Sequence, residues 1–271
     1  TSDDPHSVFV VGASGRTAAA SIQIVDPPSL VSVTGRDSNA NGKIDRVIAT
    51  FDENLAPYTA GVSPWLLTNT PSGGSLSSVS VLGPVATLDL TEGPGSATTA
   101  MGTFSLALSA NSAGIRDAAG HLATFTTTAV ADAAPPTPIG VVMKDTSSNG
   151  RIDQVVITLS ETIATYTAGT APWTLSNVPS SGSLASVAAT GTTTTLTITE
   201  GVGSPDTAVG GFTVATAGSM TGLRDAAGNL TAFSTVPTDA AKPILVSSEM
   251  FHLTADGRVD RVTATFSEPL A

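Results

Sequence analysis

The sequence predicts an all-β protein made of tandem β-sandwich domains, with about 108 residues in each repeat. Three observations lead to this fold class. The chain matches itself when it is shifted by 108 residues. Short apolar runs rich in Val and Thr alternate with Gly, Pro, Ser and Asn. No long stretch has the period of an amphipathic helix. About seven short strands in each repeat would suffice for two packed sheets.

The repeat defines the predicted domains. Residues 56–80 align without a gap on 164–188, and residues 91–125 align on 199–233. Self-similarity at a fixed period indicates an array, and a unit of this length can hold its own hydrophobic core. We therefore expect the last strands of a preceding repeat, two complete repeats and the opening hairpin of a further repeat, joined by short linkers that contain proline. The predicted bounds are 1–25, 26–133, 134–240 and 241–271.

Each expected strand is an apolar or β-branched run that ends at a cluster of turn residues. In the first repeat the strands are expected at 30–34, 46–51, 64–68, 76–82, 85–90, 103–108 and 122–128. The second repeat should carry the same strands 108 residues later.

One strand recurs as RVIATF, QVVITL and RVTATF, and it predicts which side chains are buried. Its third copy alternates Thr263 and Thr265 with apolar residues, and successive side chains in a strand point to opposite faces. Ile48 and Val156 are therefore expected to point away from the core. The expected inward set is Val47, Ala49, Phe51, Val155, Ile157, Leu159, Val262, Ala264 and Phe266.

The composition excludes several classes of partner. Only 12 % of the residues are charged, yet the formal net charge is −11. Nucleic acids and anionic membranes bind basic faces, so neither is an expected partner. The absence of cysteine rules out disulfides and thiolate metal sites. No run of 18 apolar residues is present, so direct membrane insertion is not expected.

A loop with the pattern D-x-[NS]-x-N-G-x-I-D predicts a calcium site. In the first copy, Asp37, Asn39 and Asn41 present side-chain oxygens at every second residue. Gly42 permits a turn with positive φ that aims these oxygens at one point. The main-chain carbonyl of Lys43 can add a ligand, and Asp45 closes the site directly or through water.

The motif recurs in the second repeat and again, incompletely, near residue 256. The ligands expected in the second copy are Asp145, Ser147, Asn149, the carbonyl of Arg151, and Asp153. The third copy, from His252 to Asp260, has His252 and Thr254 in the place of the first two ligands, so we expect it to be empty or weak. The alternative for these loops is that the Asp and Asn side chains cap backbone amides without an ion.

The spacing matches the first nine positions of an EF-hand loop but not the twelfth. Ile48 and Val156 stand where an EF-hand has its bidentate Glu, so a helix–loop–helix is not expected. The loop instead resembles the D-x-D-x-D-G-x-x-D loops that bridge two strands in integrin α-chain propellers. Its small number of acids predicts a dissociation constant on the order of 10⁻⁴ to 10⁻³ M, the range of extracellular modules.

Other acidic residues also recur. They are Glu53, Glu161 and Glu268 after the inward strand, Glu92 and Glu200 in TEG turns, Asp117 and Asp225 in RDAAG turns, and Asp26, Asp132 and Asp239 beside the linkers. We expect Asp26, Asp132 and Asp239 to lie in solvated turns, and the others to cap turns or to pair with a basic residue such as Arg116 or Arg224. The alternatives are a second cation site in each repeat and an interdomain calcium ion.

Trp65 and Trp173 are the only tryptophans, and each follows a proline. We expect both in the core, with stacking on a sugar ring as the alternative. An enzyme is not expected, because His6, His121 and His252 lie at unrelated positions of their repeats. No G-x-S-x-G or H-E-x-x-H motif is present either.

The run PxLVSV…DxNxNGxIDxVxxTFxExL, followed by IRDAAGN-like turns, resembles the bacterial Ig-like repeats of surface-layer proteins and large adhesins. The resemblance covers nearly the whole chain and implies tandem Ig-like β-sandwiches at the cell surface, outside the cell. It implies a non-enzymatic structural segment of a surface layer, filament or adhesin stalk, stabilised by Ca²⁺ in strand-connecting loops. The partners would be further copies or other surface proteins. The alternative is a carbohydrate- or protein-binding module of a secreted enzyme or adhesin, with glycans among its ligands.

Overall fold

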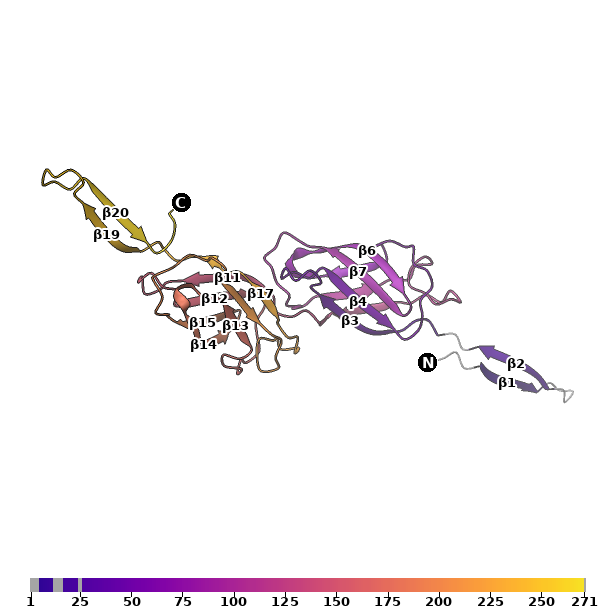
Figure 1. Cartoon of the computed structure of the whole chain (residues 1–271). Coiled ribbons are helices and arrows are strands. Elements are labelled where there is room, and N and C mark those ends of the chain that lie inside the picture. Colours follow the sequence, from indigo (N-terminus) through magenta and orange to yellow (C-terminus); the bar gives the residue numbers. More distant parts are fainter. Residues whose placement is uncertain (1–4, 12–16, 24–25, 271) are drawn as a thin grey trace. The chain divides into compact units, whose positions relative to one another are not determined.

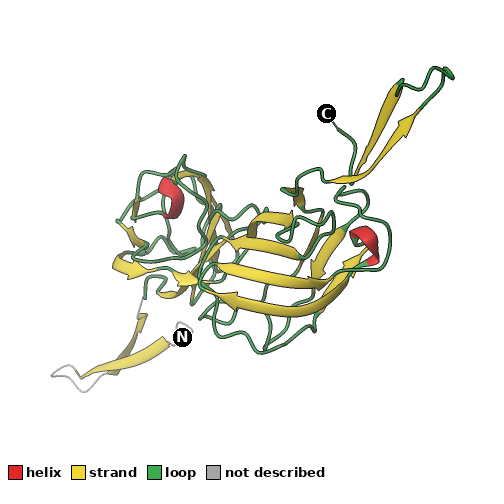
Figure 2. Cartoon of the chain, turned by 90° about the vertical axis from the view of Figure 1, so that its left-hand side faces the viewer, coloured by secondary structure: helices red, strands yellow, loops and turns green. Residues whose placement is uncertain are grey.

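The structure is a computed structural model that describes residues 5–11, 17–23 and 26–270. It is all-β, as the sequence predicts, with two short 3₁₀ helices, η1 (Pro71–Gly73) and η2 (Pro179–Ser181) (Figures 1 and 2). None of the helices in these described ranges could span a membrane. Contacts divide the chain into two compact units. The first contains residues 1–39, 43–96 and 101–134, and the second contains 40–42, 97–100 and 135–271.

The first complete repeat forms two sheets. The larger sheet has the order β10-β3-β4-β7-β6, and the smaller has the order β5-β8-β9. All neighbours pair antiparallel except β10, which pairs parallel with β3. The strands are β3 (Leu30–Arg36), β4 (Arg46–Phe51), β5 (Trp65–Thr68), β6 (Ser75–Leu82), β7 (Val85–Thr91), β8 (Ser105–Leu108), β9 (Phe125–Ala129) and β10 (Ala131–Asp132).

The second complete repeat has the same topology. Its sheets have the orders β14-β15-β12-β11-β18 and β13-β16-β17, again with one parallel pair, β11 with β18. The strands are β11 (Pro138–Lys144), β12 (Gln154–Leu159), β13 (Trp173–Ser176), β14 (Ser183–Thr190), β15 (Thr193–Thr199), β16 (Thr213–Thr216), β17 (Phe233–Thr235) and β18 (Thr238–Asp239).

The expected strands are present in both repeats, with two differences. The strand predicted at 122–128 begins only at Phe125, because Leu122 pairs with Arg116 as an isolated bridge. The two-residue strands β10 and β18 were not predicted, since a parallel pair so short leaves no pattern in the sequence. Two further hairpins are formed by β1 (Pro5–Val11) with β2 (Thr17–Gln23), and by β19 (Leu245–Phe251) with β20 (Arg261–Phe266).

Both sheets of a repeat contribute to one core, as in a sandwich. In the first repeat, Val47 and Leu88 of the larger sheet belong to the same buried cluster as Trp65 and Leu106 of the smaller sheet. The second repeat has an equivalent cluster around Ile157, Leu196, Trp173 and Val214. Full burial of one such aliphatic side chain stabilises the fold by about 1.5–3 kcal/mol.

The predicted inward faces are confirmed in the two complete repeats. All six inward residues of β4 and β12 are at most 2 % exposed, whereas Ile48 and Val156 are half-buried. The third copy of the strand differs, since Val262 is 61 % exposed. The reason is that β20 pairs only with β19 in a two-stranded sheet, so no strand of the described chain covers the face that β7 and β8 help to bury in the first repeat.

Candidate metal sites

The two predicted cation loops lie where the sequence places them, each at the bend between two antiparallel strands. Residues 37–45 join β3 to β4, and residues 145–153 join β11 to β12. Gly42 and Gly150 have φ values of +87° and +84°, which only glycine adopts without strain. Ile44 and Ile152 are each 1 % exposed and anchor the loops to the two cores.

In the second loop, two carboxylates accept hydrogen bonds from main-chain N–H groups of the loop itself. Asp145 accepts the main-chain N–H of Gly150 at 2.8 Å and that of Asn149 at 3.3 Å. Asp153 accepts the N–H of Thr146 and of Ser147, each at 3.0 Å. These bonds hold both carboxylates on one loop and leave oxygen lone pairs for a further partner.

The first loop is built in a similar way. Asp45 Oδ1 accepts the main-chain N–H of Ser38 at 2.8 Å, as Asp153 does for Thr146. Asp37 and Asp45 are half-buried, whereas Asn39 and Asn41 are exposed. The Asp side chains therefore do cap backbone amides, as the alternative for these loops requires. It does not exclude an ion, because a carboxylate can accept amide protons with one lone pair and bind a cation with another.

The third loop has the same turn, but a histidine takes the place of the first aspartate. Gly257 donates its N–H to His252 Nε2 at 2.9 Å, in the place where Gly150 donates to Asp145. Asp260 accepts bonds from the hydroxyl and N–H of Thr254 and from the N–H of Leu253, and these hydrogen bonds lower the pKa of Asp260. Because an imidazole nitrogen replaces a carboxylate, this loop offers fewer side-chain oxygens than the other two.

A glutamate from a distant turn completes each of the first two loops. Glu200 accepts a bond from Asn149 Nδ2 at 2.8 Å and one from Ser147 Oγ at 3.3 Å, and Glu92 accepts one from Asn39 Nδ2 at 2.8 Å. From the sequence, Glu92 and Glu200 are expected to be turn or salt-bridge residues, with a second cation site in each repeat as the alternative. The available signal was that both copies hold a TEG turn at the same distance from the loop.

The basic residues of the motif hold this turn in place. Lys43 Nζ donates to the carbonyl of Gly93 at 2.7 Å, and an Arg151 guanidinium N–H donates to the carbonyl of Gly201 at 2.6 Å. Each glycine directly follows the glutamate that reaches the loop. The Lys and Arg side chains thereby hold the turns whose glutamates contact Asn39 and Asn149.

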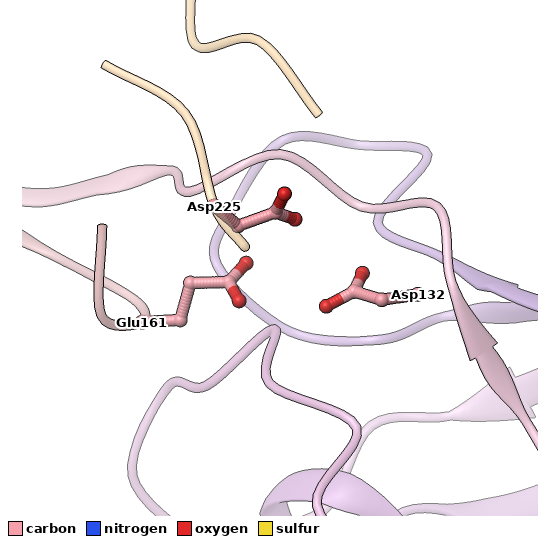
Figure 3. Close-up of side chains that lie close together, drawn as sticks. All are labelled: Asp132, Glu161 and Asp225. Carbon is pink, nitrogen blue, oxygen red and sulfur yellow. The ribbon is translucent and has the colours of Figure 1, made fainter. Parts of the chain in front are cut away.

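A separate group of three carboxylates comes together in the structure. Asp132, Glu161 and Asp225 each offer an oxygen, and these atoms all lie within 4.8 Å of one another (Figure 3). Glu161 and Asp225 are buried and Asp132 is half-buried. Carboxylate oxygens are ligands for hard cations, so this group could hold a metal ion. From the sequence these acids are expected in capping or solvated turns, with a second cation site or an interdomain calcium ion as the alternative. The spacing alone does not show that these three side chains meet.

The pairing of Arg116 and Arg224 with acids stays a prediction, and the structure gives one main-chain contact for each side chain. Arg116 donates to the carbonyl of Gly114, and Arg224 donates to that of Met220. The predicted turn capping is confirmed for Asp225, whose Oδ1 accepts the main-chain N–H of Asn229 at 2.8 Å.

An acidic pair at Asp239 and Glu268 repeats the arrangement of Asp132 and Glu161. The pKa of Glu268 is raised above 4.5, first by burial and then by the charge of Asp239, with a hydrogen bond to Asp239 and the charge of Asp206 adding to the effect. Glu268 Oε1 is buried and has no hydrogen-bond partner among the described residues.

We expect the stability of hairpin β19–β20 to fall as the pH rises. The pKa of Glu268 is raised in the folded state, so the protonated form stabilises the fold. This contribution is complete below the ordinary pKa of 4.5, and it is lost as the pH rises through the raised pKa. Amide exchange of Ser267, corrected for intrinsic rates and followed by NMR, measures the effect. Glu268→Gln, which stays neutral, should remove this part of the pH dependence. Identical profiles in both proteins would contradict the assignment.

The two tryptophans are core residues. Trp65 and Trp173 are 7 % and 8 % exposed, and each packs edge-on against a phenylalanine at 5.9 Å between ring centroids. Their indole N–H groups donate to Tyr58 and Tyr166 at 3.0 and 2.9 Å. Burial also raises the pKa of both tyrosines. The expectation of a core role is confirmed, and neither ring is free to stack on a sugar.

No protein-family model matches the chain, and no curated protein is significantly similar to it. The likeness to Ig-like surface repeats therefore remains a prediction from the motifs.

Proposed function

We propose that the chain is a non-enzymatic structural segment of a bacterial cell-surface protein, and that its loops 37–45 and 145–153 bind Ca²⁺. The segment would form part of a surface layer, a filament or an adhesin stalk outside the cell, as tandem Ig-like domains. Two sandwiches of one topology and one loop design support this role, because a load-bearing array needs repeated stable units rather than one reactive centre.

The observation that supports the proposal is the hydrogen-bond network that links side-chain oxygens at the second loop to a glutamate from another turn. Asp145 and Ser147 share a hydrogen bond, as do Ser147 and Glu200, and Asn149 and Glu200. Ca²⁺ takes six to eight oxygen ligands, from carboxylates, amide and main-chain carbonyls and water. The carboxylates of Asp145, Asp153 and Glu200, together with such neutral oxygens and water, fit this preference.

The expected affinity matches the proposed location. Loops with few acids bind Ca²⁺ with dissociation constants on the order of 10⁻⁴ to 10⁻³ M, which suits the millimolar calcium outside cells. Further copies of the chain or other surface proteins would be the partners. A sugar-binding role is the weaker candidate, because both tryptophans that could stack on a sugar are buried.

Isothermal titration calorimetry of the whole chain tests the calcium proposal. We expect two sites, one of which disappears in Asp37→Ala and the other in Asp145→Ala, because each loop loses its first carboxylate. Asp256→Ala is the matched control from the third loop and should leave both sites unchanged. Absence of calcium binding, or binding that survives in both loop variants, would refute the proposal.

A further inference from the structure

A pair of hydroxyl groups meets in the same way at two places, and both lie within the second compact unit. Thr99 Oγ1 lies 2.6 Å from Ser160 Oγ, and Thr207 Oγ1 lies 2.8 Å from Ser267 Oγ. Both threonines have no exposed surface, and both serines are 5 % exposed. Because residue types, burial and spacing all recur, the sequence specifies this contact.

The surrounding hydrogen bonds fix the direction of the contact at Thr99. Ser160 Oγ accepts the main-chain N–H of Thr137 at 2.9 Å, and Thr99 Oγ1 donates to Glu161 Oε1 at 2.5 Å. A hydroxyl has one proton, and that of Thr99 is used by the carboxylate. Ser160 therefore donates to Thr99, which gives a relay from the Thr137 amide through both hydroxyls to Glu161.

The second contact has the same parts. Ile244 donates its N–H to Ser267 Oγ at 2.9 Å, and the Thr207 side chain is hydrogen-bonded to Glu268. In addition, the main-chain N–H of Thr207 donates to the Ser267 carbonyl at 3.1 Å. This contact joins the loop before β16 in the second repeat to the hairpin that opens the next one.

The glycines of the cation loops approach the same two serines. A Cβ added at Gly42 would lie 3.3 Å from Ser160 Cβ and 2.6 Å from Ile139 Cγ2. One added at Gly150 would lie 3.4 Å from Ser267 Cβ. The bend of each loop therefore lies against the surface that carries the relay, and at Gly42 a side chain would collide with Ile139 of that surface.

We propose that the Thr–Ser–Glu relay is a docking joint, through which the threonine loop of one repeat binds the first two strands of another repeat of the same kind. The surface around Ser267 and Glu268 fits a loop whose threonine accepts a hydrogen bond from the serine and donates one to the glutamate. A buried hydroxyl without its partner is destabilising, so a loop lacking the threonine is rejected. The joint needs no metal ion and does not rest on the calcium proposal.

The first repeat provides a natural comparison. Asp52 stands where the later repeats have Ser160 and Ser267, and its Oδ1 accepts the N–H of Ser29 at 2.8 Å. An aspartate at this position therefore accepts the same main-chain hydrogen bond that Ser160 accepts from Thr137. An ionised carboxylate has no proton to donate to a threonine, so the serine is required only by the joint.

Amide hydrogen exchange of the full chain, followed by NMR in the presence of a chelator, tests the proposal. The main-chain amide at position 207 reports the joint, because its acceptor is the carbonyl of Ser267. We expect this amide to be protected in the natural sequence. Thr207→Val and Ser267→Asp should each accelerate its exchange about 10- to 100-fold. Thr263→Val, at an exposed position of β20, should leave it unchanged.

The amides of β12 separate docking from folding. They should keep their protection in both joint variants, since β12 lies in the core of the second repeat. Unchanged exchange at position 207 in both variants would overturn the proposal. Loss of protection in β12 together with position 207 would overturn it as well, because the hydroxyl pair would then hold the repeat itself. Protection at position 207 that requires calcium would contradict a metal-free joint.

Discussion

Removal of calcium by a chelator is expected to lower the melting temperature of both complete repeats. At about 10 mM calcium and a dissociation constant of 10⁻⁴ to 10⁻³ M, each occupied loop stabilises its repeat by about 1.4–2.7 kcal/mol. For a domain of this size that corresponds to roughly 5–15 °C. The gain arises because the folded loop holds Asp145, Ser147, Asn149 and Glu200 in one hydrogen-bonded network, which the unfolded chain lacks. Differential scanning calorimetry with and without chelator measures the shift.

The loop variants serve as controls for this result. Asp145→Ala should abolish the calcium-dependent shift of the second repeat only, and Asp37→Ala that of the first only. Asp256→Ala should change neither, because His252 already replaces a ligand in that loop. Magnesium should stabilise less than calcium, since it demands octahedral geometry and keeps its water. Superimposable melting curves with and without chelator would count against bound calcium.

Replacement of Trp173 by alanine is expected to cost about 3–5 kcal/mol, a large part of the 5–15 kcal/mol that typically stabilises a domain. The substitution opens a cavity beside Phe233 and leaves Tyr166 without its indole donor. Denaturant unfolding followed by circular dichroism should show the second repeat unfolding at a lower denaturant concentration than the first. Trp65 fluorescence should report an unaltered first repeat, because the two cores are separate clusters.

Two controls distinguish a core role from a surface role. Thr174→Ala, at the exposed neighbouring position of β13, should change stability by no more than about 0.5 kcal/mol. Trp173→Phe should cost less than Trp173→Ala, because it retains the aromatic packing. A Trp173→Ala variant that unfolds like the natural sequence but loses binding on a glycan array would instead indicate a sugar site.

The strands and their buried faces could be predicted because they depend on local periodicity. Val47 and Val155 are fully buried, as alternation in the strand requires. The same rule failed at Val262, which is 61 % exposed. Alternation says which face is apolar, whereas burial also depends on other strands that cover this face.

The candidate sites were predictable only where their residues are close in sequence. Asp145 and Asp153 belong to one motif, so their loop could be recognised directly. Glu200 reaches that loop from a turn about fifty residues away, whereas Asp132 ends β10 and Glu161 follows β12. Contacts of this kind depend on how strands are paired, and a single sequence contains no record of them beyond the recurrence of the residues.

Calcium in the loops 37–45 and 145–153 can be tested most directly by anomalous diffraction from crystals grown with calcium. The account predicts one anomalous peak in each loop, with oxygens of Asp37 and Asp45, and of Asp145 and Asp153, at the 2.3–2.6 Å typical of Ca²⁺. A well-resolved map without these peaks, in which the carboxylates bond only to loop amides, would contradict it.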